Sequence, residues 1–217
     1  MNILLVSRCP PYPLHLGDRL IVYHLARELS TRGHTIDLLA FVNRVEDWNE
    51  IRFYEAYFDH VELHSEPKRS PLAYARRLAL PSTRFPRRAQ DSGSPEFWAA
   101  IQRRLIARDY DVAHVFGGVQ VYEYFHALGG LPAVITPYES YSLYLRRMVE
   151  AGIMPLPRRL SLNLQWRVAR VFERFMFAPY RRTVVVSARD RDELLALNPS
   201  LNVEVIPNGV DVSAFAV

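Results

Sequence analysis

Short apolar runs alternate with segments of helical periodicity along this chain. The runs that predict strands lie at residues 3–7, 35–42, 61–64, 111–116, 133–136, 183–186 and 203–206. Strands that alternate with helices favour a parallel sheet, because each helix carries the chain back across one face of the sheet to the start of the next strand. The pattern therefore predicts an α/β, Rossmann-like fold: a parallel sheet with helices on both faces.

The helical segments carry end signals of their own. Residues 17–32 place aliphatic side chains on one face, and Gly33 follows as the residue that ends the helix in a left-handed conformation. A second helix is predicted over residues 45–58. A further helix starts after Ser187, which can cap it, with Asp190 at the third helical position.

Length and composition predict one globular domain. A chain of 217 residues can bury roughly 70% of the surface that its unfolded form exposes, which suits one core. We expect a single domain over residues 1–217, with an irregular excursion rich in proline and arginine at about residues 66–94. Cys9 is the only cysteine, so no internal disulfide is possible. Without a signal-peptide pattern or an apolar stretch of membrane-spanning length, we expect a cytoplasmic protein.

The chain is basic, with a net charge of +4 and a pI near 9.3, and Lys68 is its only lysine. This basic charge suits nucleic acid, anionic lipid or phosphorylated substrates, because the guanidinium group binds phosphate and carboxylate at two points. We expect no nucleic-acid partner, since no reading motif accompanies the charge. A dehydrogenase is disfavoured, because the loop after the first strand has one glycine instead of Gly-x-Gly-x-x-Gly.

Three segments, in order along the chain, resemble glycosyltransferase family 4. The first is PPYPLHLGDRLIVYHLARELSTRGHTIDLLAF (residues 10–41), with a proline-containing loop, a glycine, a helix and Gly-His before a strand. The second is YDVAHVFGG (residues 110–118), which is similar to the family's strand of aspartate, two hydrophobic residues and histidine. The third joins FERFMFAPYRRTVVVSARDRDELL (residues 172–195) to VIPNGVDVSAF (residues 205–215), and it is the most specific of the three.

The resemblance implies the N-terminal, acceptor-binding half of a two-domain GT-B fold. Its partners would be a nucleotide-sugar donor and a sugar or lipid-linked acceptor, and transfer would retain the anomeric configuration. In the family, the segment that corresponds to residues 208–211 leads into the donor-binding domain. We therefore expect that domain to be absent here and the chain to be inactive alone. Two alternatives stay open: half of a GT-B nucleotide-sugar epimerase, and a non-catalytic acceptor-binding or interaction module.

The loop before the first helix holds the strongest site candidates. Gly17, between a strand and a helix N-terminus, would let backbone N–H groups approach the donor phosphates; the alternative is a turn glycine. Asp18 and Arg19 follow as acceptor-binding candidates. Asp18 could instead only stabilise the first helical turn. Arg19 opposes the helix dipole, so a phosphate or carboxylate partner is expected for it.

Further candidates follow later strands. Where many relatives have His-Asp, this chain has Tyr138 and Glu139. Tyr138 is a candidate for stacking on an acceptor ring, and Glu139 is the catalytic candidate, with a helix N-terminal acid as the alternative. Gly117 should lie at the carboxyl edge of the sheet, while His114, inside a strand, is expected to be a core residue. We expect no metal site and no cofactor.

The proline- and arginine-rich excursion at about residues 66–94 contains candidates for membrane contact. Residues 68–88 carry many arginines and no acid, with apolar residues at helical spacing, which is typical of an interfacial helix. The membrane-contact candidates are Arg76, Arg77, Arg87 and Arg88, which would place the protein at the inner face of an anionic membrane; a solvent-exposed loop is the alternative. A second apolar stripe, at Leu164, Val168, Val171, Phe172 and Phe175, is interpreted as core packing.

Overall fold

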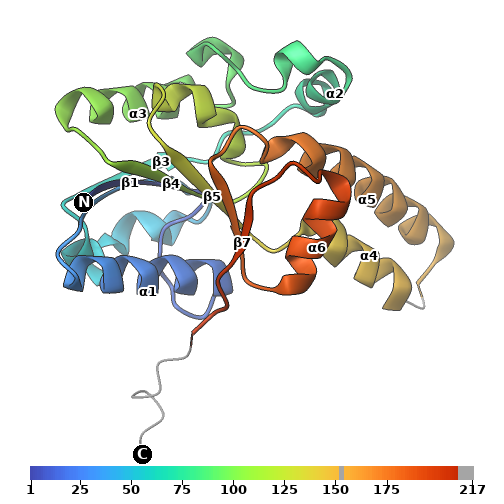
Figure 1. Cartoon of the computed structure of the whole chain (residues 1–217), viewed down its shortest axis with the longest axis horizontal. Helices are drawn as coiled ribbons and strands as arrows, with labels where there is room; N and C mark the ends of the chain where they lie inside the picture. Colours follow the sequence, from blue (N-terminus) through green and yellow to red (C-terminus); the bar gives the residue numbers. More distant parts are fainter. Residues whose placement is uncertain (152–153, 210–217) are drawn as a thin grey trace, which may run out of the picture.

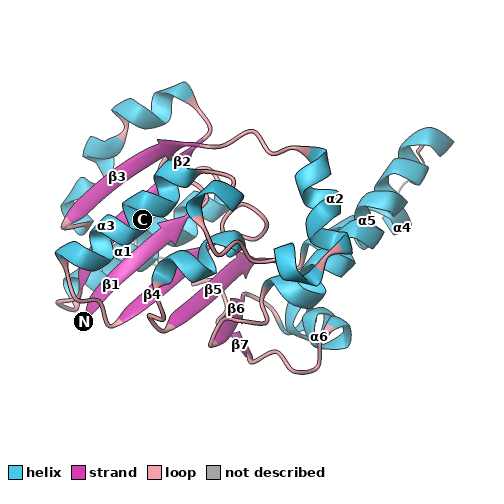
Figure 2. Cartoon of the chain, turned by 90° about the horizontal axis from the view of Figure 1, so that it is seen from above, coloured by secondary structure: helices cyan, strands magenta, loops and turns pink. Residues whose placement is uncertain are grey.

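A seven-stranded parallel sheet forms the centre of the molecule (Figures 1 and 2). The computed structural model describes residues 1–151 and 154–209. The strands lie side by side in the order β3 (His60–Ser65), β2 (Thr35–Val42), β1 (Asn2–Ser7), β4 (Val112–Phe116), β5 (Ala133–Tyr138), β6 (Arg182–Val185) and β7 (Val203–Val205). Every adjacent pair is parallel. The strand order reverses direction between β1 and β4, which is the Rossmann-like arrangement that the sequence predicts.

Two hydrophobic cores, one on each face, hold helices against the sheet. On one face, Val22 and Ala26 of α1 (Gly17–Thr31) pack with Ile3 and Leu5 of β1. On the other, α3 (Pro95–Ala107) packs with the alternate residues of the same strands. Figure 1 shows α1 and α3 on opposite sides of the strands. The prediction of helices on both faces is confirmed.

The remaining helices lie toward the β5–β7 end of the sheet or in connections. They are α2 (Pro71–Ala79), α4 (Tyr141–Ala151), α5 (Leu156–Met176) and α6 (Ala188–Leu197), with 3-10 turns η4 (Pro81–Thr83), η5 (Ala89–Asp91) and η6 (Tyr122–Leu128). The excursion at residues 66–94 therefore contains one short α-helix. Gly33 ends α1 at φ +79°, and Ser187 caps α6 by accepting a hydrogen bond from the Asp190 N–H, so both end signals are confirmed.

The helix predicted over residues 45–58 is wrong. This segment forms three 3-10 turns, η1 (Val45–Asn49), η2 (Ile51–Phe53) and η3 (Glu55–Tyr57). Its core-facing side chains are Ile51, Tyr54, Tyr57 and Phe58. The three turns are separated at Glu50 and Tyr54, where ψ is 0° and -11° and the backbone leaves helical geometry.

The interpretation of the apolar stripe on α5 as core is wrong in part. Phe172 and Phe175 are buried, but Leu164, Val168 and Val171 are exposed. The cause is the position of the helix: only its C-terminal third packs on the domain, and the rest projects beyond the sheet together with α4 (Figures 1 and 2). The sequence pattern shows which residues share a face, but not where the neighbouring structure ends.

Candidate functional site

The carboxyl edge of the sheet, at the switch point between β1 and β4, gathers most of the predicted site residues. Open parallel sheets bind ligands at this edge, because connections leave in opposite directions there and open a crevice. Four segments meet: the loop after β1, the N-terminus of α1, the turn after β4 and the end of β5. Gly17, Asp18, Gly117, Tyr138 and Glu139 lie in three of them.

Gly17 is the first residue of α1 and faces open space. Leu16, the N-cap residue, makes no capping hydrogen bond through its side chain. A Cβ atom built on Gly17 would have no atom within 4 Å among the described residues. The fold itself therefore does not require glycine here. The free space lies at a helix N-terminus, where backbone N–H groups and the helix dipole favour an anion.

Asp18 and Tyr138 come together through Arg8, a residue that sequence reasoning missed. Arg8 forms an ion pair with Asp18, with its Nε 3.1 Å from Oδ2, and its guanidinium carbon lies 5.3 Å from the centre of the Tyr138 ring. Partial burial disfavours the charged form of Asp18, but the hydrogen bond and charge of Arg8 outweigh it and lower the pKa of Asp18. The sequence signal that could have identified Arg8 is its position: a cation directly after the first strand.

Tyr138 adopts a backbone conformation that is rare for its type. Its φ is +72°, and it is the only residue other than glycine with positive φ in the described part of the chain. A bulky side chain in the left-handed region costs free energy, so the surrounding structure must hold it there. Its ring contacts Phe116, with ring centres 5.6 Å apart, and burial raises the pKa of its hydroxyl well above the ordinary value.

Glu139 follows Tyr138 and is exposed at the edge of the sheet. Partial desolvation and the nearby charge of Asp190 raise the pKa of the Glu139 carboxyl. The next residue, Ser140, donates its backbone N–H to Asp190 Oδ1 at 2.9 Å. The left-handed turn at Tyr138 and this hydrogen bond thus fix the backbone on both sides of Glu139.

A buried glutamate supports the same loop from behind. Glu173 of α5 accepts hydrogen bonds from the N–H of Tyr141, at 2.6 Å, and from the hydroxyl of Ser140, at 3.1 Å, and so caps the N-terminus of α4. Burial raises the pKa of Glu173 to about 7, although these hydrogen bonds favour its charged form. Glu173 lies in the third family-like segment (residues 172–195), but the sequence alone predicts no role for it.

Glycine at position 117 allows the Arg8 side chain to pack closely against the turn after β4. Its φ is +122°, and a Cβ atom there would lie 2.9 Å from the Cβ of Arg8. A side chain at this position would therefore push Arg8 away from Asp18. The predicted placement of Gly117 at the carboxyl edge is confirmed.

Arg19 does not lie in the site, contrary to the predicted acceptor contact. Its side chain is 2% exposed, and its Nη1 and Nη2 lie 2.6 and 3.1 Å from the two carboxylate oxygens of Asp47. Nη2 also donates to Asn43 at 3.0 Å. The carboxylate partner expected for Arg19 therefore comes from the chain itself, and it joins α1 to η1.

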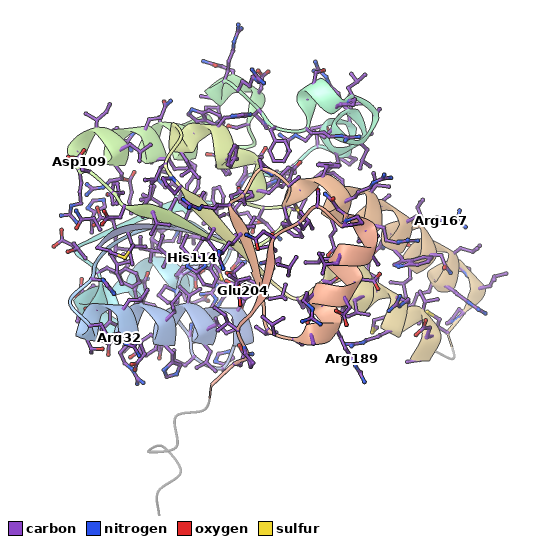
Figure 3. The ribbon with its side chains drawn as sticks, viewed as in Figure 1. Arg32, Asp109, His114, Arg167, Arg189 and Glu204 are labelled. Atoms are coloured by element: carbon purple, nitrogen blue, oxygen red, sulfur yellow. The ribbon has the colours of Figure 1, made fainter. Side chains whose placement is uncertain are left out.

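His114 is a neutral, hydrogen-bonded residue within β4, as predicted, but it is only partly buried. Its Nε2 lies 2.8 Å from the hydroxyl oxygen of Thr136, and desolvation lowers its pKa to about 4. The imidazole is thus uncharged at neutral pH, and it lies inside the sheet (Figure 3).

The sequence matches the family model described as Glycosyltransferase Family 4 over residues 20–214. The chain belongs to glycosyltransferase family 4. Among curated protein sequences, none matches it.

Solved structures with a similar arrangement include three proteins of low sequence identity. The N-terminal domain of Candida albicans trehalose-6-phosphate phosphatase is 12% identical, with 98% of this chain and 49% of that chain covered and a TM-score of 0.49. A UGT transferase from Siraitia grosvenorii in complex with UDP is 10% identical, with 99% and 54% covered and a TM-score of 0.47. Acinetobacter baumannii MurG is 13% identical, with 98% and 69% covered and a TM-score of 0.40. The family 4 chain thus spans about half the length of the first two.

The family 4 domain also has an open cavity of about 460 Å³ beside the carboxyl ends of β2 and β3. Arg44, Trp48 and Lys68 line it, together with Val42, Asn43, Val45, Ser65, Glu66 and Pro67. Trp48 is 45% exposed. Within the described residues, Lys68 has no ion-pair partner. Sequence reasoning missed this cavity, because its walls come from two loops that only the sheet brings together.

The four arginines predicted to contact a membrane separate into two groups. Arg77 is buried, where it forms an ion pair with Glu123, and Arg69 lies 3.0 Å from the same carboxylate. The prediction for Arg77 is therefore wrong: its charge neutralises a buried acid of η6 that is remote in sequence. Arg76, Arg87 and Arg88 are exposed.

Two features are absent from the described residues: a cluster of metal ligands and a membrane-spanning helix. Across residues 1–151 and 154–209, no group of three or more His, Cys, Asp or Glu side chains is arranged to hold a metal ion. None of the helices in these ranges combines the length and the hydropathy that crossing a membrane requires. Val210 and Asp211, in the segment expected to lead to a second domain, lie outside the described residues.

Proposed function

We propose that this domain is the acceptor-binding half of a glycosyltransferase that moves a sugar from a nucleotide-sugar donor to an acceptor. The observation that carries the proposal is the open space beside Gly17, at the switch point of the sheet and at an α1 N-terminus where the N-cap residue Leu16 supplies no side-chain cap. A donor diphosphate placed there would meet backbone N–H groups and the positive end of the helix dipole. A second, donor-binding domain would supply the opposite wall.

The residues around Gly17 suit an acceptor. Asp18 is ionised and oriented by Arg8. Its Oδ2 already accepts from Arg8 and Cys9, and its Oδ1 accepts from the Arg19 N–H, so the remaining lone pair of Oδ1 can accept a hydrogen bond from a sugar hydroxyl. The Tyr138 ring is half-buried, with Arg8 over the ring and Phe116 in contact with it, and the acceptor would pack against its accessible part. Glu139 is exposed, and its raised pKa brings it closer to the range in which a carboxylate exchanges protons near neutral pH. We assign Glu139 the catalytic role.

The cavity beside β2 and β3 extends this surface. Trp48 offers an exposed aromatic face and Lys68 an unpaired positive charge, which together suit an acceptor that carries both a sugar ring and an anionic group. A phosphate-bearing or lipid-linked saccharide precursor has this chemistry. We propose that the acceptor binds in this cavity and reaches toward Asp18, at the cytoplasmic side of a membrane that Arg76, Arg87 and Arg88 approach.

The test is transfer by a polypeptide that carries both this domain and a donor-binding domain. The chain alone should show no transfer from a panel of nucleotide sugars, whereas the two-domain polypeptide should transfer to a phosphorylated or lipid-linked saccharide. Glu139→Gln should abolish transfer, while Glu55→Gln, at another exposed glutamate, should not. Conversion of the donor without an acceptor would indicate an epimerase. Acceptor binding without turnover would indicate a non-catalytic module, and robust transfer by the chain alone would contradict the two-domain reading.

A further inference from the structure

The part of α5 that projects from the domain exposes a continuous apolar stripe. Five large side chains of this helix are between 37% and 67% exposed: Leu156, Leu160, Leu164, Val168 and Val171. They follow one another at intervals of four, four, four and three residues, so they lie along one face of the helix. Single exposed leucines are common, but five in one row form a patch that usually contacts something.

The exposed charges of α5 are all positive. Five arginines, at positions 158, 159, 167, 170 and 174, are exposed on this helix. None of them forms an ion pair with a described residue. The only acid in α5, Glu173, is buried at the cap of α4, so it does not neutralise this surface. Figure 3 shows Arg167 pointing away from the domain, at the opposite end of the molecule from Arg32.

α2 lies beside α5 and extends the same kind of surface. The Tyr74 ring of α2 packs edge-on against Phe172 of α5, with centres 5.6 Å apart, and the two helices are neighbours in both ribbon views (Figures 1 and 2). Leu72 of α2 is 77% exposed, and Arg76 is exposed as well. The two helices together therefore offer apolar side chains interspersed with arginines.

We propose that this α5 surface, formed by the five exposed apolar residues and the five exposed arginines of α5, binds an anionic lipid leaflet. A helix that lies in a membrane interface combines an apolar face with basic residues beside it, so that acyl chains cover the first and headgroup phosphates neutralise the second. A protein partner would need a row of unpaired acids that matched these arginines, whereas an anionic leaflet supplies negative charge everywhere. Vesicle binding needs neither donor nor acceptor, so its outcome is separate from that of the transfer test.

The experiment is co-sedimentation of the purified chain with vesicles of phosphatidylcholine alone or with phosphatidylglycerol added. Wild type should bind only the anionic vesicles, and less as salt rises. A charge variant with Arg159, Arg167 and Arg170 changed to glutamine should bind about a hundredfold more weakly, since each arginine contributes about fivefold near an anionic surface. An apolar variant with Leu156, Leu160 and Leu164 changed to serine should also lose most binding.

Two control variants test whether the location matters. Arg32→Gln removes an exposed arginine at the end of α1, and Ile106→Ser removes a side chain of α3 that is 88% exposed. Both should bind as wild type does. Because every substituted side chain is exposed, urea unfolding should be unchanged and binding losses can be assigned to the surface. Equal binding by wild type and the charge variant, equal binding to neutral vesicles, or self-association through α5 without any vesicle binding would overturn the proposal.

Discussion

Two adjacent residues in the first turn of α1 form ion pairs in different environments, one at the surface and one in the interior. Asp18 pairs with Arg8 at the surface, where the two side chains are 20% and 36% exposed. Arg19 pairs with Asp47 in the interior, where the side chains are 0% to 2% exposed. The first pair orients a carboxylate that a ligand can still reach, while the second locks α1 to η1. Adjacent charged residues thus serve binding and stability separately, and burial decides which.

The buried pair should give the largest effect on stability. Asp47→Ala should lower the free energy of unfolding by about 3–5 kcal/mol, because it leaves the Arg19 charge buried without a partner. Urea unfolding measures this loss. The double variant Arg19→Met, Asp47→Leu, which removes both charges, should be much closer to wild type. A loss of less than about 1 kcal/mol for Asp47→Ala would mean that this pair behaves like a surface pair.

Glu173 is a buried acid that forms no ion pair with a described residue, and so it contrasts with Asp47. Since its pKa rises from 4.5 to about 7 on folding, the folded state binds more protons, and stability should fall as pH rises through that range. The fall should be on the order of 3 kcal/mol. His114, with its pKa lowered to about 4, has the opposite effect: its contribution to stability is lost as pH falls from 6.5 toward 4. The difference in unfolding free energy between wild type and Glu173→Gln isolates the glutamate, and a difference that does not change with pH would contradict the assignment.

The surface pair should contribute much less to stability. Asp18→Asn should lower the free energy of unfolding by about 1 kcal/mol or less, since water and salt screen a partly exposed pair. In the two-domain polypeptide, the same substitution should raise the KM for the acceptor. Matched urea curves for Asp18→Asn and Asp47→Ala make the comparison direct, and equal losses would remove the distinction between the two pairs.

Gly17 should show the smallest effect on stability together with a strong effect on function. Gly17→Ala should raise the free energy of unfolding by about 0.4–1 kcal/mol, because the site is open and alanine restricts the unfolded chain. Gly17→Val should reduce transfer in the two-domain polypeptide by the loss of a phosphate hydrogen bond, about 1.5–3 kcal/mol. Gly118→Ala, on the same edge, is the control. Unchanged steady-state kinetics for Gly17→Val would leave Gly17 as a turn residue.

Most of the fold could be predicted from the sequence, because its strands are short apolar runs with clear boundaries. The run at residues 35–42 matches β2 (Thr35–Val42), and Gly33 and Ser187 mark helix ends through local backbone chemistry.

The candidate site was predicted less completely. Gly17, Asp18, Tyr138 and Glu139 do meet at one edge, since parallel strands bring their carboxyl ends together. Arg8, Trp48 and Glu173 were missed as site or supporting residues because their partners lie far away in sequence.

The sequence by itself determined the sheet and the residues at the carboxyl edge of that sheet, because both follow from local periodicity. It also determined the family, because the family motifs are contiguous in the chain. Only the tertiary structure decided which charges are free. Arg19 and Arg77 have the same sequence signature as exposed arginines, yet Asp47 and Glu123 bind them in the interior. The apolar stripe of α5 looks like core but extends beyond its neighbours into solvent. Burial and pairing depend on what the fold places opposite a side chain, and local sequence does not contain that information.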